Sequence, residues 1–215
     1  MRWTRAVADV RLYLIMDATP RVPLPRFLDA AIDGGVGMVQ LREKHMDDAA
    51  LLDLARRCAQ QCRLRGVPFI VNDRADIALA AGADGVHVGH DDLPASAVRS
   101  LIGRERIIGV STHSPAQIDA VSSDADYIGV GPIHETPTKP GRPAVGAELV
   151  RYAAAYAGRP FFAIGGLVPG NVGEVIAAGG RAISVYRWIT RSEDPARAAR
   201  EMLAAMGVTR EEARP

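Results

Sequence analysis

The stretch V-N-D-R-A-D-I-A-L-A-A-G-A-D-G-V-H-V-G-H-D-D-L-P, residues 71–94, decides the fold. It reads as the end of one strand, a short helix over Ala75–Ala81 and a second strand over Gly85–Val88. The helix is predicted because apolar residues recur at helical spacing and stop at Gly82. Parallel strands joined by a helix form a β-α-β unit, which brings both strand ends to the same edge of a sheet.

Acidic residues follow both strands of this unit. Asp73 comes directly after the first strand, and Asp91 and Asp92 follow the second. Because the carboxyl ends of parallel strands share one edge, we expect Asp73 to face either Asp91 or Asp92. Two converging carboxylates form a hard-oxygen site that suits Mg²⁺ and a phosphate-bearing ligand. The alternative interpretation is that these residues only cap helices.

The composition is that of a globular protein and excludes several partners. The 215 residues are 48% hydrophobic, and 26 basic side chains balance 25 acidic ones to a formal net charge of +1. This balance gives no support to nucleic acid or an acidic membrane surface as a partner. Aromatic residues make up only 5% of the chain, which also argues against base stacking.

The cysteines and the early apolar run indicate the compartment. Cys58 and Cys62 are too few and too close for a disulfide framework or a four-ligand zinc site, so we expect free thiols in a reducing cytoplasm. The apolar run 12–16 is too short for a signal peptide core or a membrane span. The sequence therefore predicts a cytoplasmic protein.

Strand and helix patterns alternate along the whole chain. The strands are continuous apolar runs, as in parallel strands that are buried on both faces. We expect strands at 11–17, 38–42, 68–71, 85–88, 106–110, 126–131, 160–164 and 181–186. We expect helices at 24–32, 46–65, 75–81, 93–101, 114–122, 146–157, 171–178 and 195–206. Eight such units predict a single-domain α/β (β/α)₈ TIM barrel over residues 1–215, with frayed ends at 1–9 and 208–215. An open doubly wound sheet is the alternative, but no G-x-G-x-x-G follows the first strand.

In such a barrel the chemistry lies on the loops after the strands. Those loops carry cations, carboxylates and hydroxyl groups, which together suit a Mg²⁺-diphosphate. They contain Arg42, Glu43, Lys44, Asn72, Asp73, Arg74, Asp91, Asp92, Ser111, Thr112, His113, Thr136, Thr138 and Lys139. The pair Gly165-Gly166 precedes a helix, where backbone N–H groups can approach a phosphate, although such pairs also occur as plain turns.

Six ordered motifs make the chain resemble the thiamine-phosphate synthase family. They are Q-L-R-E-K at 40–44, V-N-D-R at 71–74, G-A-D-G-V-H-V-G-H-D-D-L at 82–93, G-V-S-T-H at 109–113, G-V-G-P-I-H-E-T-P-T-K at 129–139 and A-I-G-G at 163–166. The resemblance covers nearly the whole chain. It implies an enzyme that joins a hydroxymethylpyrimidine diphosphate to a thiazole phosphate and releases diphosphate. The partners implied are small molecules, and a homo-oligomer is left open.

The resemblance also implies roles for individual residues. Asp73 and Asp92 match the Mg²⁺ ligands, so Mg²⁺ is the expected cofactor. The pyrimidine and its diphosphate would be held by Gln40, Arg42, Lys44, Asn72, Ser111 and Lys139, of which Arg42, Lys44, Ser111 and Lys139 are the catalytic candidates. The thiazole phosphate would be held by Thr136 and Thr138, and through backbone N–H groups by Gly166 and by the end of the eighth strand at Tyr186 and Arg187. Whether the Arg187 side chain adds a contact to the same phosphate is left open.

Two other interpretations use the same barrel. A thiazole tautomerase would need a general base, for which His113 is the candidate, but it would not need the diphosphate site. A non-catalytic protein that binds thiamine precursors would fit if the bulky Trp188, which stands where the family usually has a small residue, filled the thiazole pocket. We expect Trp188 instead to point outward and pack against a helix, with Ile189 at the pocket rim.

Overall fold

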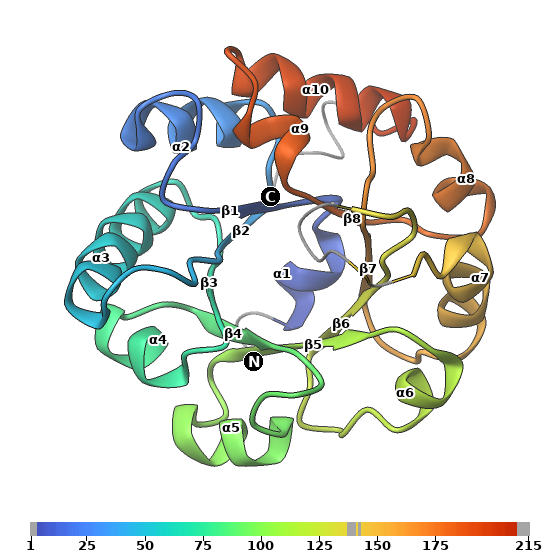
Figure 1. Cartoon of the computed structure of the whole chain (residues 1–215), viewed down its shortest axis with the longest axis horizontal. Helices are drawn as coiled ribbons and strands as arrows, with labels where there is room; N and C mark the ends of the chain where they lie inside the picture. Colours follow the sequence, from blue (N-terminus) through green and yellow to red (C-terminus); the bar gives the residue numbers. More distant parts are fainter. Residues whose placement is uncertain (1–3, 137–140, 142, 210–215) are drawn as a thin grey trace.

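The computed structural model describes residues 4–136, 141 and 143–209. Eight parallel strands follow one another around a closed barrel, with helices outside it (Figure 1). The strands are β1 Leu12–Met16, β2 Met38–Leu41, β3 Phe69–Asn72, β4 Gly85–Val88, β5 Ile107–Thr112, β6 Tyr127–Val130, β7 Phe161–Ile164 and β8 Ile183–Val185. The ring closes because β1 pairs with β8, Leu12 opposite Ile183, as well as with β2. The predicted single-domain TIM barrel is confirmed.

Capping side chains and glycines mark the ends of several of the helices. They are α1 Thr4–Asp9, α2 Leu24–Asp33, α3 Asp48–Leu64, α4 Ala75–Ala81, α5 Ala95–Ile102, α6 Pro115–Asp119, α7 Gly146–Tyr156, α8 Val172–Ala177, α9 Arg187–Thr190 and α10 Pro195–Ala205. The Asp47 carboxylate caps α3 by accepting a hydrogen bond from the Ala50 N–H at 3.0 Å. Gly82 ends α4 in the left-handed conformation, with φ of 67°.

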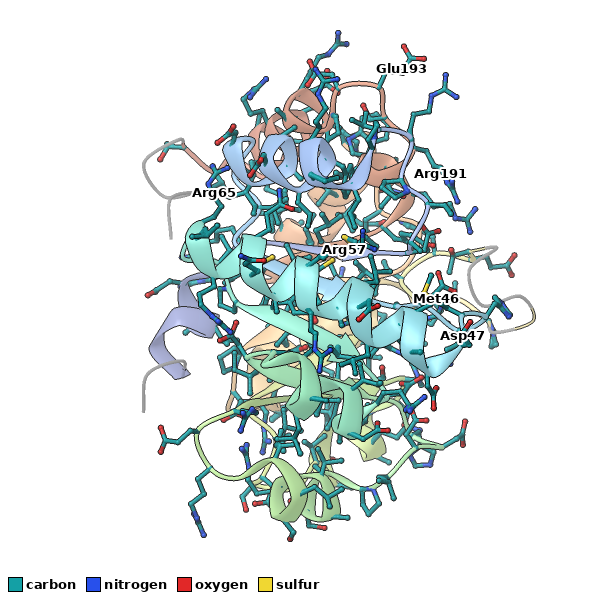
Figure 2. All side chains as sticks on the ribbon, turned by 90° about the vertical axis from the view of Figure 1, so that its left-hand side faces the viewer. Met46, Asp47, Arg57, Arg65, Arg191 and Glu193 are labelled. Atoms are coloured by element: carbon teal, nitrogen blue, oxygen red, sulfur yellow. The ribbon has the colours of Figure 1, made fainter. Side chains whose placement is uncertain are left out.

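Packing between neighbouring helices uses both close approach and charge. A side chain at Gly34, at the end of α2, would lie 2.6 Å from the Ala196 carbonyl oxygen of α10, so glycine lets these two helices touch. Arg65, which follows α3 and is labelled in Figure 2, pairs with Asp29 and Asp33 of α2. These contacts join α2 to α10 and to the end of α3 in the outer layer.

Two helices were absent from the sequence-based prediction. The start of the chain, expected to be frayed over residues 1–9, forms α1 at Thr4–Asp9, which lies across one opening of the barrel (Figure 1). Val7 and Val10 are 1% and 5% exposed and pack in one cluster with Met38 and Ile107, the first residues of their strands. Helix α1 therefore closes the amino-terminal end of the barrel. The second additional helix, α9, follows β8 directly. Of the predicted frayed end 208–215, residues 210–215 lie outside the described part of the chain.

Among the described residues, no helix is both long enough and apolar enough to cross a bilayer.

The Arg99 guanidinium ties α5 to the strand starts. It donates hydrogen bonds to the carbonyl oxygens of Gly103, Arg106 and Asp124 at 2.6–2.8 Å, and to the Asp126 carboxylate at 2.8 Å. The Asp126 carboxylate also accepts a hydrogen bond from the backbone N–H of Ile108 in β5 at 2.8 Å. The Arg99 and Asp126 side chains are only 14% and 25% exposed, so water replaces this pairing poorly.

We expect Arg99→Ala to lower the free energy of unfolding by about 3 kcal/mol, because a largely buried carboxylate and several carbonyl groups lose their donor. Urea unfolding at neutral pH measures the loss. Arg197→Ala is the matched control, since Arg197 is 73% exposed and pairs with Glu201 one helical turn away. That control should change stability by less than about 0.5 kcal/mol. Equal losses in the two variants would contradict this account.

Candidate active site

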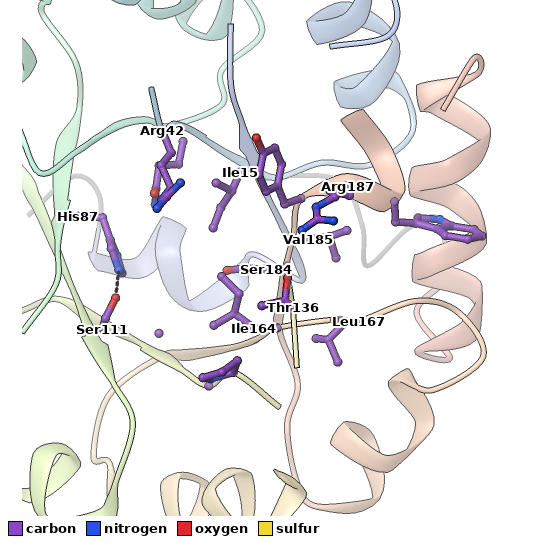
Figure 3. Close-up of a pocket in the computed structure, with 18 of the residues that line it drawn as sticks. Ile15, Arg42, His87, Ser111, Thr136, Ile164, Leu167, Ser184, Val185 and Arg187 are labelled. Atoms are coloured by element: carbon purple, nitrogen blue, oxygen red, sulfur yellow. Dashed lines mark hydrogen bonds between the residues drawn. The ribbon is translucent and has the colours of Figure 1, made fainter. Parts of the chain in front are cut away.

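The carboxyl ends of the strands surround a cavity of about 240 Å³ (Figure 3). Eight of the residues predicted to bind substrate contribute to its wall: Gln40, Arg42, Asn72, Ser111, Thr136, Gly166, Tyr186 and Arg187. Arg42, His87 and Ser111 lie at one end of the cavity, and Thr136, Leu167 and Arg187 lie at the other (Figure 3). Thr138 and Lys139 lie outside the described residues.

Two carboxylates and one ammonium group meet next to Asn72 of the cavity wall. The Lys44 Nζ atom lies 3.1 Å from the Asp73 carboxylate. The Asp92 carboxyl group interacts with that of Asp73, so Asp92, which the family resemblance implies, is the partner, and not Asp91, which strand order alone left open. Asp92 is itself held by the Gly89 N–H, which donates to it at 2.7 Å.

A strained turn places Asp73. Its φ is 62°, and no other non-glycine residue among those described has a positive φ. The Arg74 N–H donates to the Asn72 carbonyl oxygen at 2.7 Å across the turn, and the Asp73 N–H donates to the His87 carbonyl oxygen at 2.8 Å. Aspartate tolerates this conformation better than most residues, but it still costs about 1–3 kcal/mol. Such strain at a carboxylate on the barrel rim is typical of functional sites.

The surroundings of Asp73 disfavour its charge. Burial raises the pKa of its carboxyl group, Lys44 partly opposes this, and the neighbouring Asp92 raises the pKa further, so the net shift is upward. A divalent cation between Asp73 and Asp92 would relieve this repulsion, so the two residues fit a Mg²⁺ site. The described part of the chain contains no group of three or more His, Cys, Asp or Glu side chains that could hold an ion. The remaining oxygen ligands of a cation here would therefore come from a substrate and from water.

The Gly165-Gly166 pair is more than a plain turn. Both residues have a positive φ, 111° and 63°. A Cβ at Gly165 would lie 2.5 Å from the Pro132 Cα, and one at Gly166 would lie 2.8 Å from the His134 Cβ. The Ile133 N–H donates to the last carbonyl group of β7 at 2.8 Å, so the β6 and β7 loops lie side by side. Glycine is needed here for close packing as well as for the exposed backbone at the cavity.

Helix α9 directs the bulky side chains that follow β8. The Trp188 indole N–H donates to the Ala198 carbonyl oxygen of α10 at 3.0 Å, which confirms that Trp188 points outward, although it still contributes to the cavity wall. Ile189, expected at the pocket rim, is fully buried, because the turn of α9 carries it into the core. The Tyr186 hydroxyl donates to the Asp17 carboxylate at 2.5 Å.

Sequence reasoning missed three polar residues: His87, which lines the cavity, and Tyr13 and Tyr127, which are buried in the barrel interior. They form a continuous series of hydrogen bonds that joins Gln40 to Ser111 through the barrel interior. The signal that could have found them is His87, a single polar residue in the apolar strand Gly85–Val88. The two tyrosines gave no signal, because tyrosine is an ordinary residue in strands.

A parallel barrel with this cavity and these carboxylates at its carboxyl-terminal rim is typical of barrel enzymes that act on small phosphorylated molecules. A family model described as thiamine monophosphate synthase matches residues 12–189. The chain belongs to this family, and its activity is the synthesis of thiamine phosphate.

Individual relatives agree with this assignment. The thiamine-phosphate synthase of Acidothermus cellulolyticus is 50% identical over 205 residues, which cover 94% of this chain and 97% of that protein. The thiamine-phosphate synthase of Streptomyces avermitilis is 48% identical over 199 residues, 91% of this chain and 93% of that one. The solved structure of a thiamine phosphate pyrophosphorylase from Pyrococcus furiosus superimposes with a TM-score of 0.84 at 29% identity, covering 94% of this chain and 97% of that chain. These relatives favour the synthase over the tautomerase and over the non-catalytic protein.

We expect Asp73→Asn to stabilise the protein in EDTA at pH 7 by up to about 1 kcal/mol, because it removes a disfavoured charge from a half-buried position. The raised pKa of Asp73 means that its charged form destabilises the folded state, so removing the charge should stabilise the protein. At a pH between the pKa of Asp73 in the unfolded state and its higher pKa in the folded state, the folded protein holds a proton that the unfolded chain has lost. The native protein therefore loses stability as the pH rises through that interval. The advantage of the Asn variant should therefore be absent below the unfolded pKa and complete above the folded one. Thermal unfolding across this pH range measures it.

Two further variants separate charge from backbone strain, since Asn also tolerates a positive φ. Asp92→Asn relieves the same repulsion without changing the turn at Asp73, and it should also stabilise the protein. Asp91→Asn changes an exposed neighbour and should have no effect. A gain in Asp73→Asn alone would assign the effect to the burial or the turn of Asp73 rather than to repulsion by Asp92.

We expect Trp188→Ala to lower the free energy of unfolding by about 3 kcal/mol, because its indole packs against α10. The KM for the thiazole phosphate should stay within a few-fold of wild type. Trp188→Phe keeps most of the packing and should lose about 1 kcal/mol. A large fall in this KM with unchanged stability would show that Trp188 occupies the pocket.

Proposed function

We propose that this cavity joins 4-amino-2-methyl-5-hydroxymethylpyrimidine diphosphate to hydroxyethylthiazole phosphate and releases diphosphate. The observation that carries the proposal is the contact of Asp73, Asp92 and Lys44 at the rim, beside a cavity that also contains a Gly-Gly loop. Cations and carboxylates together suit a metal-bound diphosphate, and the glycine loop suits a second phosphate. The cavity therefore offers two anion sites with an apolar and hydroxyl-lined space between them.

The diphosphate end would use charge. Asp73 and Asp92 would hold Mg²⁺, which when bound neutralises part of the charge that develops on the departing diphosphate. Lys44 and Arg42 supply fixed positive charge to the same group, and Asn72 supplies an amide donor. By its resemblance to the family, Lys139 adds a further cation. Departure of the diphosphate leaves a pyrimidinylmethyl cation, which the amino group of the ring stabilises and the thiazole nitrogen then attacks.

The far end would bind the thiazole phosphate. Gly166 offers a backbone N–H group at the cavity wall, and Thr136 and Arg187 offer side-chain donors. Helix α9 begins directly after β8, and barrels commonly bind phosphate with the loops after strands seven and eight and a short extra helix. Thr138 would add a second hydroxyl group, as the resemblance implies, and Tyr186 closes this side of the wall.

This reaction needs no protein nucleophile, and the two thiols do not supply one. Cys58 and Cys62 are buried on α3 and do not line the cavity. Burial raises the pKa of Cys58 to about 12, so it stays a thiol at neutral pH. Free thiols agree with the cytoplasm as the compartment, which we propose on that ground.

Diphosphate release tests the function. With both substrates and Mg²⁺ the protein should release diphosphate, and EDTA should stop the reaction. We expect Asp73→Ala and Asp92→Ala to lower the rate about a hundredfold or more. Asp91→Ala is the matched control and should keep the wild-type rate. Near-normal turnover of Asp73→Ala after EDTA treatment would refute the metal assignment, and isomerisation of a thiazole phosphate without diphosphate release would indicate the tautomerase.

A further inference from the structure

A series of four hydrogen bonds crosses the barrel interior directly beneath the cavity. The Gln40 Nε2 atom donates to the Tyr13 hydroxyl at 2.5 Å, and the Tyr13 and Tyr127 hydroxyls lie 2.8 Å apart. The Tyr127 hydroxyl lies 3.0 Å from the His87 Nδ1 atom, and the His87 Nε2 atom lies 3.0 Å from the Ser111 Oγ atom. These side chains come from five different strands, and we call them the interior chain. Both of its ends, Gln40 and Ser111, line the cavity, and His87 next to Ser111 also reaches the wall.

The interior chain is built into the core. Tyr13 is 1% exposed, Tyr127 is fully buried and His87 is 9% exposed. The Phe162 ring packs edge-on against both tyrosines, with ring centroids 5.2 and 5.4 Å away. Buried hydroxyl and imidazole groups destabilise a core unless they are paired, and here each one has a partner in the interior chain. Apolar side chains could fill this space, so the polar residues call for another explanation.

Gly109 of β5 makes room for the interior chain. A Cβ at this position would lie 2.1 Å from the Tyr127 ring and 2.4 Å from the His87 Nδ1 atom. Gly109 does not have a positive φ, so space rather than backbone conformation requires glycine here. The glycine of the motif G-V-S-T-H is thereby explained by the residues that lie opposite it.

With a neutral imidazole at His87, the hydrogen atoms in the interior chain run in one of two directions. Burial raises the pKa of both phenols, so each keeps its proton and donates once. When the Gln40 amide nitrogen donates to Tyr13, the protons run toward Ser111, and the Ser111 hydroxyl is left to donate into the cavity. The carbonyl oxygen of Gln40 is then left to accept. Reversing the direction flips the Gln40 amide, rotates both phenol hydroxyls, exchanges the His87 tautomer and makes Ser111 an acceptor.

We propose that Tyr13, Tyr127 and His87 are positioning residues that couple Gln40 to Ser111, so that the cavity selects an aminopyrimidine over its oxo counterpart. The inference rests on the proposed use of Gln40 and Ser111 for the pyrimidine. An amino group donates to the Gln40 carbonyl oxygen while a ring nitrogen accepts from Ser111. The oxo form accepts where the amino form donates, and it carries a proton on a ring nitrogen. It therefore requires the whole interior chain to reverse, rather than a single side chain to rotate.

Binding to the pyrimidine diphosphate and to its 4-oxo analogue, measured by calorimetry with Mg²⁺, tests this coupling. Wild type should bind the amino compound at least about a hundredfold more tightly, because the oxo compound leaves Gln40 and Ser111 mismatched unless the whole interior chain reverses. Tyr127→Phe interrupts the interior chain at its middle and should reduce that preference about tenfold or more. Tyr13→Phe interrupts the interior chain at the neighbouring residue, so it provides an independent test in case Tyr127→Phe does not fold. Tyr152→Phe removes a surface hydroxyl that binds Asp119 and should keep the wild-type preference.

A double-mutant cycle gives a second readout that a purely structural role would not change. The effects of Gln40→Ala and Ser111→Ala on binding should be non-additive in wild type by about fivefold or more, and additive in Tyr127→Phe. The inference would be overturned if wild type bound the two pyrimidines with equal affinity. It would also be overturned if folded Tyr127→Phe and Tyr13→Phe kept the wild-type preference for the amino compound. Diphosphate release by wild type tests the proposed function separately, because these binding ratios do not depend on turnover.

Discussion

Closure of eight parallel strands into a ring places every loop after a strand on one rim, and the rest of this structure depends on that constraint. Residues far apart in the sequence, such as Lys44 and Asp92, become neighbours of Asp73 only because β2, β3 and β4 are consecutive in the ring. The other end of the barrel is closed by α1, with Val7 buried against the strand starts. A cavity at the rim therefore has a solid base, and ligands can reach it only from the side where the polar loops lie.

That base is unusual because it is polar. A barrel this small fills its interior with side chains, and apolar ones would do so without any requirement for partners. The interior chain instead fixes the orientation of each member through its two neighbours, with Phe162 and Gly109 limiting the space available. An amide or hydroxyl at a cavity wall normally rotates to suit its ligand. Here Gln40 and Ser111 can do so only together, because each is the end of one series of hydrogen bonds.

The strands and most helices were predictable, because buried parallel strands are continuous apolar runs and the helices carry an apolar face. The pairing of Asp73 with the loop after β4 followed from strand order. The choice of Asp92 over Asp91 came only from the family resemblance, because it depends on how one loop folds back onto Gly89. Helix α9 has only four residues and shows no periodicity. Helix α1 gains its stability from the barrel end that Val7 covers. The interior chain gave one signal only, the polar His87 in an apolar strand, because the hydrogen bond between Tyr13 and Tyr127 joins residues 114 positions apart and each tyrosine alone is an ordinary strand residue.

The Asp73 and Asp92 pair shows how the site and the fold oppose each other. Without a cation, burial and the second carboxylate raise the pKa of Asp73, and the turn that holds it has a φ of 62°. Both features destabilise the folded protein. The same repulsion adds to the affinity for a divalent cation, because the cation removes it on binding. Lys44 reduces the repulsion, but it is a single exposed charge and cannot satisfy two carboxylates. If Mg²⁺ binds here, as we propose, Lys44 becomes free to contact the diphosphate, so one ion would complete the metal site and release a substrate-binding cation.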